Sequence, residues 1–231
     1  MGKVLYFSRR GKRSPVCKDS VYFRDGRQMG VYSLADGLNS KKWSKQGAEA
    51  VQRALASEAE KQGKGLLARS ELKIKTDTIE IIRRTLYNLC EEKGCPDDYA
   101  STLMTLFISP ETGMFCFIHI GDGLIVKEAA DGELSVVSHP HNGITRQFTY
   151  TTAHEQLERY TRVGKMPLKD VRRLFMLTDG AAFPLYNDRK LTRRGRYLLG
   201  RGTACVLEEL KWIGPADDHS MVEIHVDDRE G

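Results

Sequence analysis

Aspartates that follow apolar runs are the residues of this 231-residue chain whose type and spacing could do chemistry. Three of its five Asp-Gly pairs, at Asp36, Asp122 and Asp179, close the strand-like segments "YSLADG", "FIHIGDG" and "LFMLTDG". An unpaired carboxylate is expensive to bury, so such groups are usually paired or bound to a metal ion. The other two pairs, at Asp25 and Asp131, have polar neighbours and join strand-like segments, which predicts hairpin turns.

A cluster of carboxylates repels itself and therefore needs a cation between its members. Further acids occur near both ends of the chain, with Asp19 in "CKDS" and the neighbours Asp217 and Asp218 in "ADDHS". Carboxylate and carbonyl oxygens, together with water, suit Mg²⁺ or Mn²⁺. Each Asp-Gly pair alone could be an ordinary strand-end turn, but three of them with these additional acids favour a metal cluster.

The segments between these aspartates predict the elements that must position them, because their apolar residues recur with helical or strand periods. Helices are expected at 43–61, at 77–93 and within 181–213, and strands within 101–139, at 172–180 and at 217–226. This order predicts an α+β fold with two layers of antiparallel sheet and helices packed outside, not alternating β-α units.

Composition limits the class of protein. Hydrophobic residues make up 40% of the chain, enough for a core, and we expect a single domain over residues 1–231. No apolar run is long enough to span a membrane, and the first residues lack the apolar core of a signal peptide. Five cysteines without framework spacing predict free thiols and, with no signal peptide, a cytoplasmic location.

The net charge of +5 is mild for this length. The basic stretches 9–13 and 189–196 come without the motifs of nucleic-acid readers, so neither nucleic acid nor membrane is an expected partner. The second stretch is either a solvated surface or a docking site for an acidic phosphoprotein.

Five short motifs resemble, in order, those of the metal-dependent protein phosphatase 2C family, and most closely its compact bacterial branch. They are "KDS", "LADGLNS", "HIGDG", "LFMLTDG" and "DDHSMV", and the resemblance extends from about Cys17 to Val226. It implies a four-layer α-β-β-α sandwich, in which two antiparallel sheets are flanked by helices. It also implies hydrolysis of phosphoserine and phosphothreonine in a phosphorylated protein, with two Mg²⁺ or Mn²⁺ ions and a companion Ser/Thr kinase.

The resemblance implies metal-binding roles as well. Asp36 would be the carboxylate shared by both ions, and Gly37 would offer its backbone carbonyl. Asp179 and Asp217 would hold the second ion, and together with Asp36 they form the expected catalytic set. Asp19 would support the ligands of the first ion through water.

Two further positions follow from the same comparison. Asp122 matches the position of a third, weaker ion. Aligning Ser220 with the Ser or Thr of the family's last motif makes Asp217 the ligand and leaves Asp218 as its support.

The chain departs from the family at the phosphate-binding arginine, which usually lies five residues before the early aspartate. Ser14 stands there, so we transfer this role to Arg13, with Arg9 and Arg10 as alternatives. A cation is needed because a phosphate dianion must be oriented, which arginine does bidentately.

Leu38 and Asn39 are further departures. Larger members often have His, a candidate general acid, at the position of Leu38, and Gly is common at that of Asn39. These changes keep a second function open, a pseudophosphatase that binds phosphoproteins as a regulatory module. Retention of all the mutually repelling acids argues against it.

The remaining histidines are given structural interpretations. His119 is expected to be satisfied within a sheet, and His139 and His141 to lie in a solvent-exposed loop, because sites for hard cations prefer oxygen. Residues 142–160 fall where family members carry a flap or its reduced equivalent.

Overall fold

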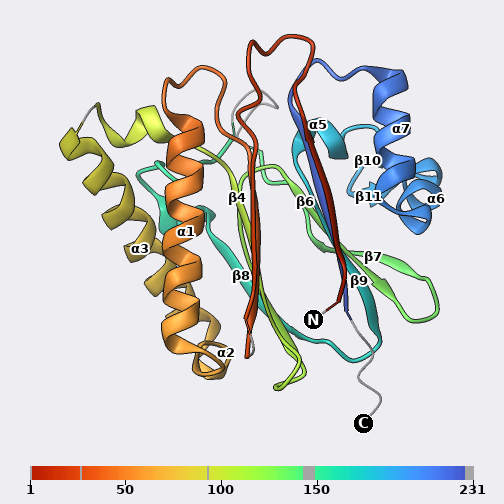
Figure 1. Cartoon of the computed structure of the whole chain (residues 1–231), viewed down its shortest axis with the longest axis horizontal. Helices are drawn as coiled ribbons and strands as arrows, with labels where there is room; N and C mark the ends of the chain where they lie inside the picture. The colour runs from red at the N-terminus through yellow and green to blue at the C-terminus, as the bar shows by residue number, and fades with distance from the viewer. Residues whose placement is uncertain (1, 27, 93, 143–148, 227–231) are drawn as a thin grey trace.

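The computed structural model describes residues 2–26, 28–92, 94–142 and 149–226. Two five-stranded antiparallel sheets lie face to face, and helices cover both outer faces (Figure 1). Sheet A has the strand order β1-β12-β9-β6-β7, and sheet B has the order β2-β3-β4-β5-β8. The expected α+β sandwich of four layers is thereby confirmed.

The bounds of the elements are as follows. Sheet A consists of β1 (Val4–Arg9), β6 (Leu124–Ala129), β7 (Leu134–Ser138), β9 (Val171–Leu177) and β12 (His219–His225). Sheet B consists of β2 (Ser20–Asp25), β3 (Gly30–Ala35), β4 (Leu103–Ser109), β5 (Met114–Ile120) and β8 (Arg162–Pro167). The helices are α1 (Ser44–Gln62), α2 (Gly65–Ala68), α3 (Glu71–Glu92), η1 (Pro96–Tyr99), α4 (Leu157–Tyr160), α5 (Asp179–Ala182), α6 (Arg193–Arg201) and α7 (Thr203–Ile213), and β10 (Tyr186–Asn187) and β11 (Lys190–Leu191) form a small hairpin.

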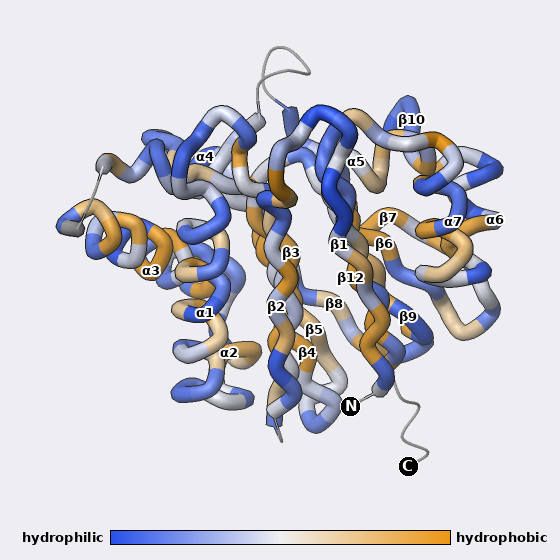
Figure 2. Tube along the Cα trace, turned by 45° about the horizontal axis from the view of Figure 1, so that its top comes forward, coloured by the Kyte–Doolittle hydropathy of each residue, from blue (hydrophilic) through white to orange (hydrophobic). Residues whose placement is uncertain are grey.

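Alternation of side chains along the strands builds three apolar layers. In β4, Phe107 joins the core under α1 and α3, whereas its neighbour Leu106 joins the core between the sheets. In β9, Phe175 joins the core under α6 and α7, and Met176 faces the other sheet. The central strands are therefore apolar on both faces, and Figure 2 shows hydrophobic residues along β3, β4 and β12.

Helices α1 and α3 cover sheet B. The first lies where it was predicted, and it approaches η1 so closely that a Cβ on Gly47 would be 2.2 Å from the carbonyl oxygen of Tyr99. The second begins at Glu71, six residues before the prediction. The first turn shows no helical period of apolar residues, because Ile74 is surrounded by polar residues in the sequence. Ile74 itself is buried in the core.

Residues 181–213 contain the predicted helices and a hairpin that was not predicted. Thr192 caps α6 by accepting a hydrogen bond from the Gly195 N–H (2.8 Å), and α7 ends at Gly214 in the left-handed conformation (φ 63°). Helices α6 and α7 cover the outer face of sheet A (Figure 1). Their buried side chains complete the third core.

Three smaller expectations can be compared with the structure. Asp25-Gly26 lies between β2 and β3, and Asp131-Gly132 between β6 and β7, so both hairpin predictions are confirmed. All five cysteines lie in the described ranges and are free. Among the residues whose placement is described, no helix is both long enough and apolar enough to cross a membrane.

Candidate active site

The aspartates identified in the sequence lie at one end of the two sheets. In sheet B, Asp19 precedes β2, Asp36 follows β3 and Asp122 follows β5, and the antiparallel register aligns these strand ends. In sheet A, Asp179 follows β9 and Asp217 lies just before β12, and the adjoining ends of these two strands are paired. Both rows belong to the end of the molecule where α5 lies, at the top of Figure 1.

Asp36 is the carboxylate on which the others converge. It is half-buried. Burial is the main cause that holds the pKa of Asp36 well above its usual value, and the charges of Asp19, Asp179, Asp122 and Asp217 raise it further. Side chains from both sheets are therefore within electrostatic reach of one another.

The peptide that joins Asp36 to Gly37 is held by the segment before β4. The Asp36 N–H donates to Thr102 Oγ1 (2.9 Å), and the Asp36 carbonyl accepts from the Thr102 N–H (2.8 Å). A Cβ on Gly37 would be 2.9 Å from the Lys18 carbonyl oxygen and 3.0 Å from Ser44 Oγ. Glycine is required here because the surrounding chain approaches this closely.

Asp19 links the two sheets. It is 2% exposed, and its Oδ2 accepts hydrogen bonds from Ser220 Oγ (2.5 Å) and Thr178 Oγ1 (3.3 Å) of sheet A. Its other oxygen, Oδ1, is buried and has no hydrogen-bond partner in the described part of the chain. Burial is the main cause that raises the pKa of Asp19 to about 7, and the nearby Asp218 raises it as well.

Asp179 and Asp122 face each other across the same end. Asp179 is the first residue of α5, and burial, followed by the charges of Asp122 and Asp217, raises its pKa to about 7. Its Oδ1 accepts from the Gly180 N–H (2.6 Å). Asp122 accepts a hydrogen bond from Thr149, and burial raises its pKa too.

The neighbours Asp217 and Asp218 differ in exposure and in their hydrogen-bond partners. Asp218 is 1% exposed, and its two oxygens accept from the backbone N–H groups of Gly11 (2.8 Å) and Lys18 (2.7 Å). Asp217 is exposed and contributes to the repulsion at Asp36. Asp218 therefore anchors the loop between β1 and β2, whereas Asp217 lies at the surface and its Oδ1 accepts a hydrogen bond from Asn39 Nδ2 (2.8 Å).

These carboxylates are close without forming a closed coordination sphere. Among the described residues, no group of three or more His, Cys, Asp or Glu side chains is arranged to hold a metal ion. The assignment of individual ligands to Asp19, Asp36, Gly37, Asp122, Asp179 and Asp217 stays a prediction.

The candidate phosphate-binding arginines do not converge on the cluster. The Arg13 N–H donates to the Ala216 carbonyl (2.9 Å), and its exposed side chain makes no hydrogen bond or ion pair with any described residue. Arg10 Nη1 donates to the Pro15 carbonyl (3.3 Å). Arg9 ends β1 opposite His219. The role of Arg13 also stays a prediction.

Residues that hold the cluster were missed in the sequence. Lys18 Nζ donates to the carbonyl oxygens of Asn39 (3.0 Å) and Lys41 (2.5 Å) and so fixes the loop that follows Asp36. Thr178 and Ser220 hold Asp19, as described above. These residues could have been found from their position next to the candidate aspartates in the sequence. Lys18 precedes Asp19 in "CKDS", and the hydroxyls of Thr178 and Ser220 belong to the motifs "LTDG" and "DDHS".

The histidine predictions need correction. His139 Nδ1 lies 2.6 Å from Tyr186 Oη, and the ring of His141 packs edge-on against Tyr150 with 4.9 Å between centroids. Both histidines are half-buried, so the prediction of a solvent-exposed loop was wrong. His119 Nδ1 pairs with Ser138 Oγ (2.8 Å), but within the described ranges its buried Nε2 has no partner. The predicted flap at 142–160 lies partly outside the described residues.

A sequence model of the protein phosphatase 2C family matches residues 8–212, so this chain belongs to that family. Its members are protein serine/threonine phosphatases that are normally metal-dependent, which confirms the resemblance and the enzyme class expected from the motifs. No curated protein sequence matches the chain significantly.

Solved structures share the fold at low sequence identity. Serine/threonine phosphatase Stp1 from Staphylococcus aureus superposes with a TM-score of 0.70 and 12% identity, covering 98% of this chain and 96% of that one. The catalytic domain of the serine/threonine protein phosphatase PstP, solved with two manganese ions, superposes with a TM-score of 0.68 and 18% identity, covering 97% of this chain and 98% of that one. RsbX in complex with magnesium superposes with a TM-score of 0.62 and 16% identity, covering 95% of this chain and 92% of that one.

Proposed function

We propose that this protein is a metal-dependent phosphatase that hydrolyses phosphoserine and phosphothreonine in a phosphorylated protein. The observation that carries the proposal is the convergence of four aspartates from both sheets on Asp36, in a chain of the protein phosphatase 2C family. A companion Ser/Thr kinase would supply the substrate. The five free cysteines support a reducing, cytoplasmic location.

A divalent cation fits the residues at this end of the sheets. Structural relatives were solved with manganese or magnesium, and the carboxylate oxygens here are the donors that such ions prefer. The buried, unpartnered Oδ1 of Asp19 further supports an external positive charge. When bound, such ions lower the pKa of water and neutralise the charge of phosphoryl oxygens.

We assign two ions to the cluster, with a third, weaker one at Asp122. The first two would share Asp36, with the Gly37 carbonyl on one side and Asp179 and Asp217 on the other. Asp19 would act through water.

The remaining residues position these ligands and the substrate. Asp218 fixes the loop that carries Arg13, and the backbone of Arg13 is hydrogen-bonded beside Asp217. We assign orientation of the phosphate to the Arg13 guanidinium, because it has no other partner among the described residues and can bind bidentately. No protein nucleophile is needed.

The proposal is tested with p-nitrophenyl phosphate and a phosphothreonine peptide in the presence of Mn²⁺. We expect hydrolysis by the wild type, loss of at least about a thousandfold in kcat/KM for Asp179→Asn, and near wild-type activity for Asp170→Asn. Asp170 is an exposed acid that takes no part in the cluster and tolerates Asn at its positive φ of 61°. Full activity in excess chelator would refute the proposal.

A pseudophosphatase remains the alternative, and one contact favours it. Asn39 Nδ2 donates to Asp217 Oδ1 (2.8 Å), so one candidate ligand oxygen already has a partner, and Leu38 supplies no general acid. Calorimetric titration with Mn²⁺ separates the two functions. Absence of binding at millimolar Mn²⁺ would favour the pseudophosphatase, and saturable binding would favour the enzyme.

A further inference from the structure

A large groove opens beside the carboxylates of the candidate active site. It has a volume of about 1010 Å³ and is lined by residues from the segment 179–189 and from the segment 213–217. Asp122, Asp179 and Asp217 form part of its wall. Because ligand pockets typically measure about 300–1,000 Å³, this groove has room for much more than a phosphate group.

Apolar side chains line the groove away from the aspartates. Phe183 is 76% exposed and Ile213 38% exposed, and Pro184 and Pro215 line the groove as well. The Phe183 N–H donates to the Asp179 carbonyl (2.8 Å), so the backbone that carries the ring is held one helical turn from a candidate metal ligand. An exposed aromatic side chain in a groove is a typical anchor point for a protein partner.

The cationic side chain of Arg189 lies at the edge of the groove, in the turn between β10 and β11. Asp188 (φ 48°) and Arg189 (φ 61°) both adopt the left-handed conformation, which two-residue hairpins usually assign to Asn-Gly or Asp-Gly. Arginine is disfavoured at this backbone conformation, and yet it lines the groove here. Burial and then the charge of Arg189 lower the pKa of His139, in agreement with a guanidinium that faces the nearby loop.

A second cation lies next to another residue that lines the groove. The ammonium group of Lys12 lies against Gly214, where a Cβ would come within 2.2 Å of Lys12 Nζ. Gly214 itself lines the groove. The groove thus joins the aspartates to an apolar surface, with positive charges at Arg189 and at Lys12.

We propose that this groove binds the polypeptide adjacent to the phosphorylated residue and selects a segment with a bulky apolar side chain and an acidic residue. The inference rests on the proposed phosphatase function, because a phosphoresidue held at the aspartates must lead its chain past this surface. The apolar side chain would pack against Phe183 and Ile213, and the acidic residue would meet Arg189 or Lys12. Complementary charges of this kind contribute mainly to selectivity and to the association rate.

The first test compares two substrates of different size. It uses p-nitrophenyl phosphate and phosphothreonine peptides in which one Phe and one Asp are moved from position to position around the phosphothreonine. For the preferred peptide, Phe183→Ala and Arg189→Ala should each lower kcat/KM, relative to that for p-nitrophenyl phosphate, by about tenfold. The matched controls Trp212→Ala and Lys190→Ala alter an exposed aromatic and an exposed cation outside the groove, and they should leave this ratio unchanged.

A second test does not depend on catalysis. A photo-crosslinking benzoylphenylalanine at position 183 should capture the same phosphopeptide, whereas one at exposed Tyr197 on α6 should not. A wild type that hydrolyses neither substrate would refute the phosphatase function, and selective capture at position 183 would still support the groove. Equal capture at both positions, or a substrate ratio that the groove variants leave unchanged, would overturn the groove proposal.

Discussion

Acids cluster in two regions of the molecule, and the structure deals with their charge in opposite ways. At the end of the sheets near α5, five aspartates crowd together, and none of them has an ion pair with a described residue. Under α6 and α7, on the outer face of sheet A, Glu128 and Glu223 enclose Arg173 in a buried triad.

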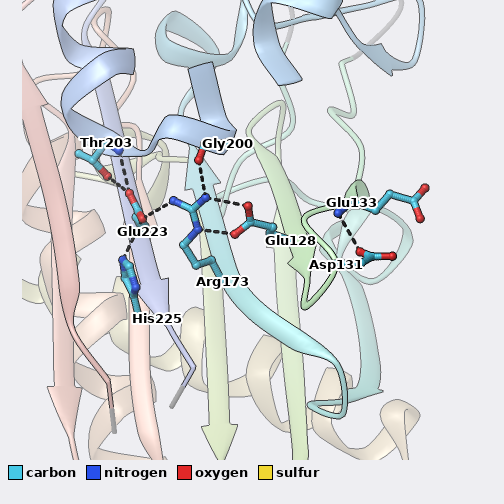
Figure 3. A network of polar contacts seen from close by, with 8 residues as sticks. All are labelled: Glu128, Asp131, Glu133, Arg173, Gly200, Thr203, Glu223 and His225. Atoms are coloured by element: carbon cyan, nitrogen blue, oxygen red, sulfur yellow. Dashed lines mark hydrogen bonds and ion pairs between the residues drawn. The ribbon is translucent and has the colours of Figure 1, made fainter. Parts of the chain in front are cut away.

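The triad is fully partnered (Figure 3). Arg173 Nη2 donates to Glu128 Oε1 (2.7 Å) and to the Gly200 carbonyl (2.8 Å), and its Nη1 donates to Glu223 Oε1 (2.8 Å). Glu223 Oε2 also accepts from the N–H (2.7 Å) and the hydroxyl (2.6 Å) of Thr203. The network therefore ties the end of α6 and the start of α7 to three strands of the sheet.

The difference is visible in the pKa values. Burial raises the pKa of Glu223, but the hydrogen bonds from Thr203 and Arg173 outweigh burial and lower it overall. Hydrogen bonds from Ser220 and Thr178 also lower the pKa of Asp19, but burial outweighs them, and this pKa rises to about 7. Acids with an internal cation belong to the framework of the fold, whereas acids that lack one are candidates for a functional site.

The largest expected effect comes from removing the internal cation. Arg173→Met leaves two buried glutamates unpaired, and breaking a buried ion pair in this way costs about 3–5 kcal/mol. The free energy of unfolding should fall by this amount in urea denaturation. Arg172→Met, which replaces an exposed arginine one residue earlier, should change it by less than about 0.5 kcal/mol. Equal losses in both variants would show that the triad has no special part in stability.

A smaller effect is expected from pH on the metal-free protein. The pKa values of Asp19 and Asp179 rise from 3.8 to about 7, so their protonated forms favour the folded state. This stabilisation is complete below an acid's ordinary pKa and is lost as the pH rises through 7. With chelator present, each of the two acids should lower the free energy of unfolding by about 2 kcal/mol between about pH 5.5 and about pH 8.

Added Mn²⁺ should reduce this fall, because a bound cation replaces the protons. Glu223 does not interfere in this range, since an acid with a lowered pKa loses its contribution only at more acidic pH. Burial lowers the pKa values of His119, His139, His141 and His219, so these histidines stabilise the folded state increasingly as the pH rises toward 6.5, which opposes the effect of the acids. The contribution of the aspartates is therefore read as the difference between the wild type and Asp179→Asn. If the metal-free wild type and metal-free Asp179→Asn changed in stability by the same amount over this range, the raised pKa of Asp179 would be contradicted.

The sequence predicted the aspartate end better than the triad. Asp36, Asp122 and Asp179 each follow an apolar run, and an acid directly after a buried strand is conspicuous in the sequence. Glu128 and Arg173 instead occupy alternate positions within strands, where a charged residue ordinarily faces solvent. They are buried because α6 and α7, which follow them in the chain, pack over this face of the sheet. The local sequence pattern does not predict this packing.

Other predictions from local sequence patterns were also wrong where burial depends on segments that are distant in the chain. The first turn of α3 was missed because Ile74 lies among polar residues, and its burial depends on helix packing. His139 was placed in solvent, although Tyr186, distant in the sequence, partners it. The division between Asp217 and Asp218 was predicted only through the family motif, since the backbone donors of Gly11 and Lys18 are about 200 residues away.

The smallest expected effects compare one hydroxyl from each region. Thr203→Val removes a hydrogen bond to the charged Glu223 and should cost about 1–2 kcal/mol, with or without Mn²⁺. Ser220→Ala removes a donor to Asp19 and should instead weaken Mn²⁺ binding about tenfold in calorimetry. The comparison would fail if Ser220→Ala bound Mn²⁺ as the wild type does, or if Thr203→Val weakened binding by the same factor.

The most direct measurement is the melting temperature of Asp36→Asn and of the wild type, each with chelator and with Mn²⁺. With chelator, the variant should melt at a higher temperature than the wild type, because Asn cannot ionise at a position where burial and four neighbouring acids oppose ionisation. Mn²⁺ should raise the melting temperature of the wild type and leave that of the variant nearly unchanged. A variant that is less stable than the wild type in chelator, and that Mn²⁺ stabilises as strongly, would contradict the conclusion that these aspartates await an external cation.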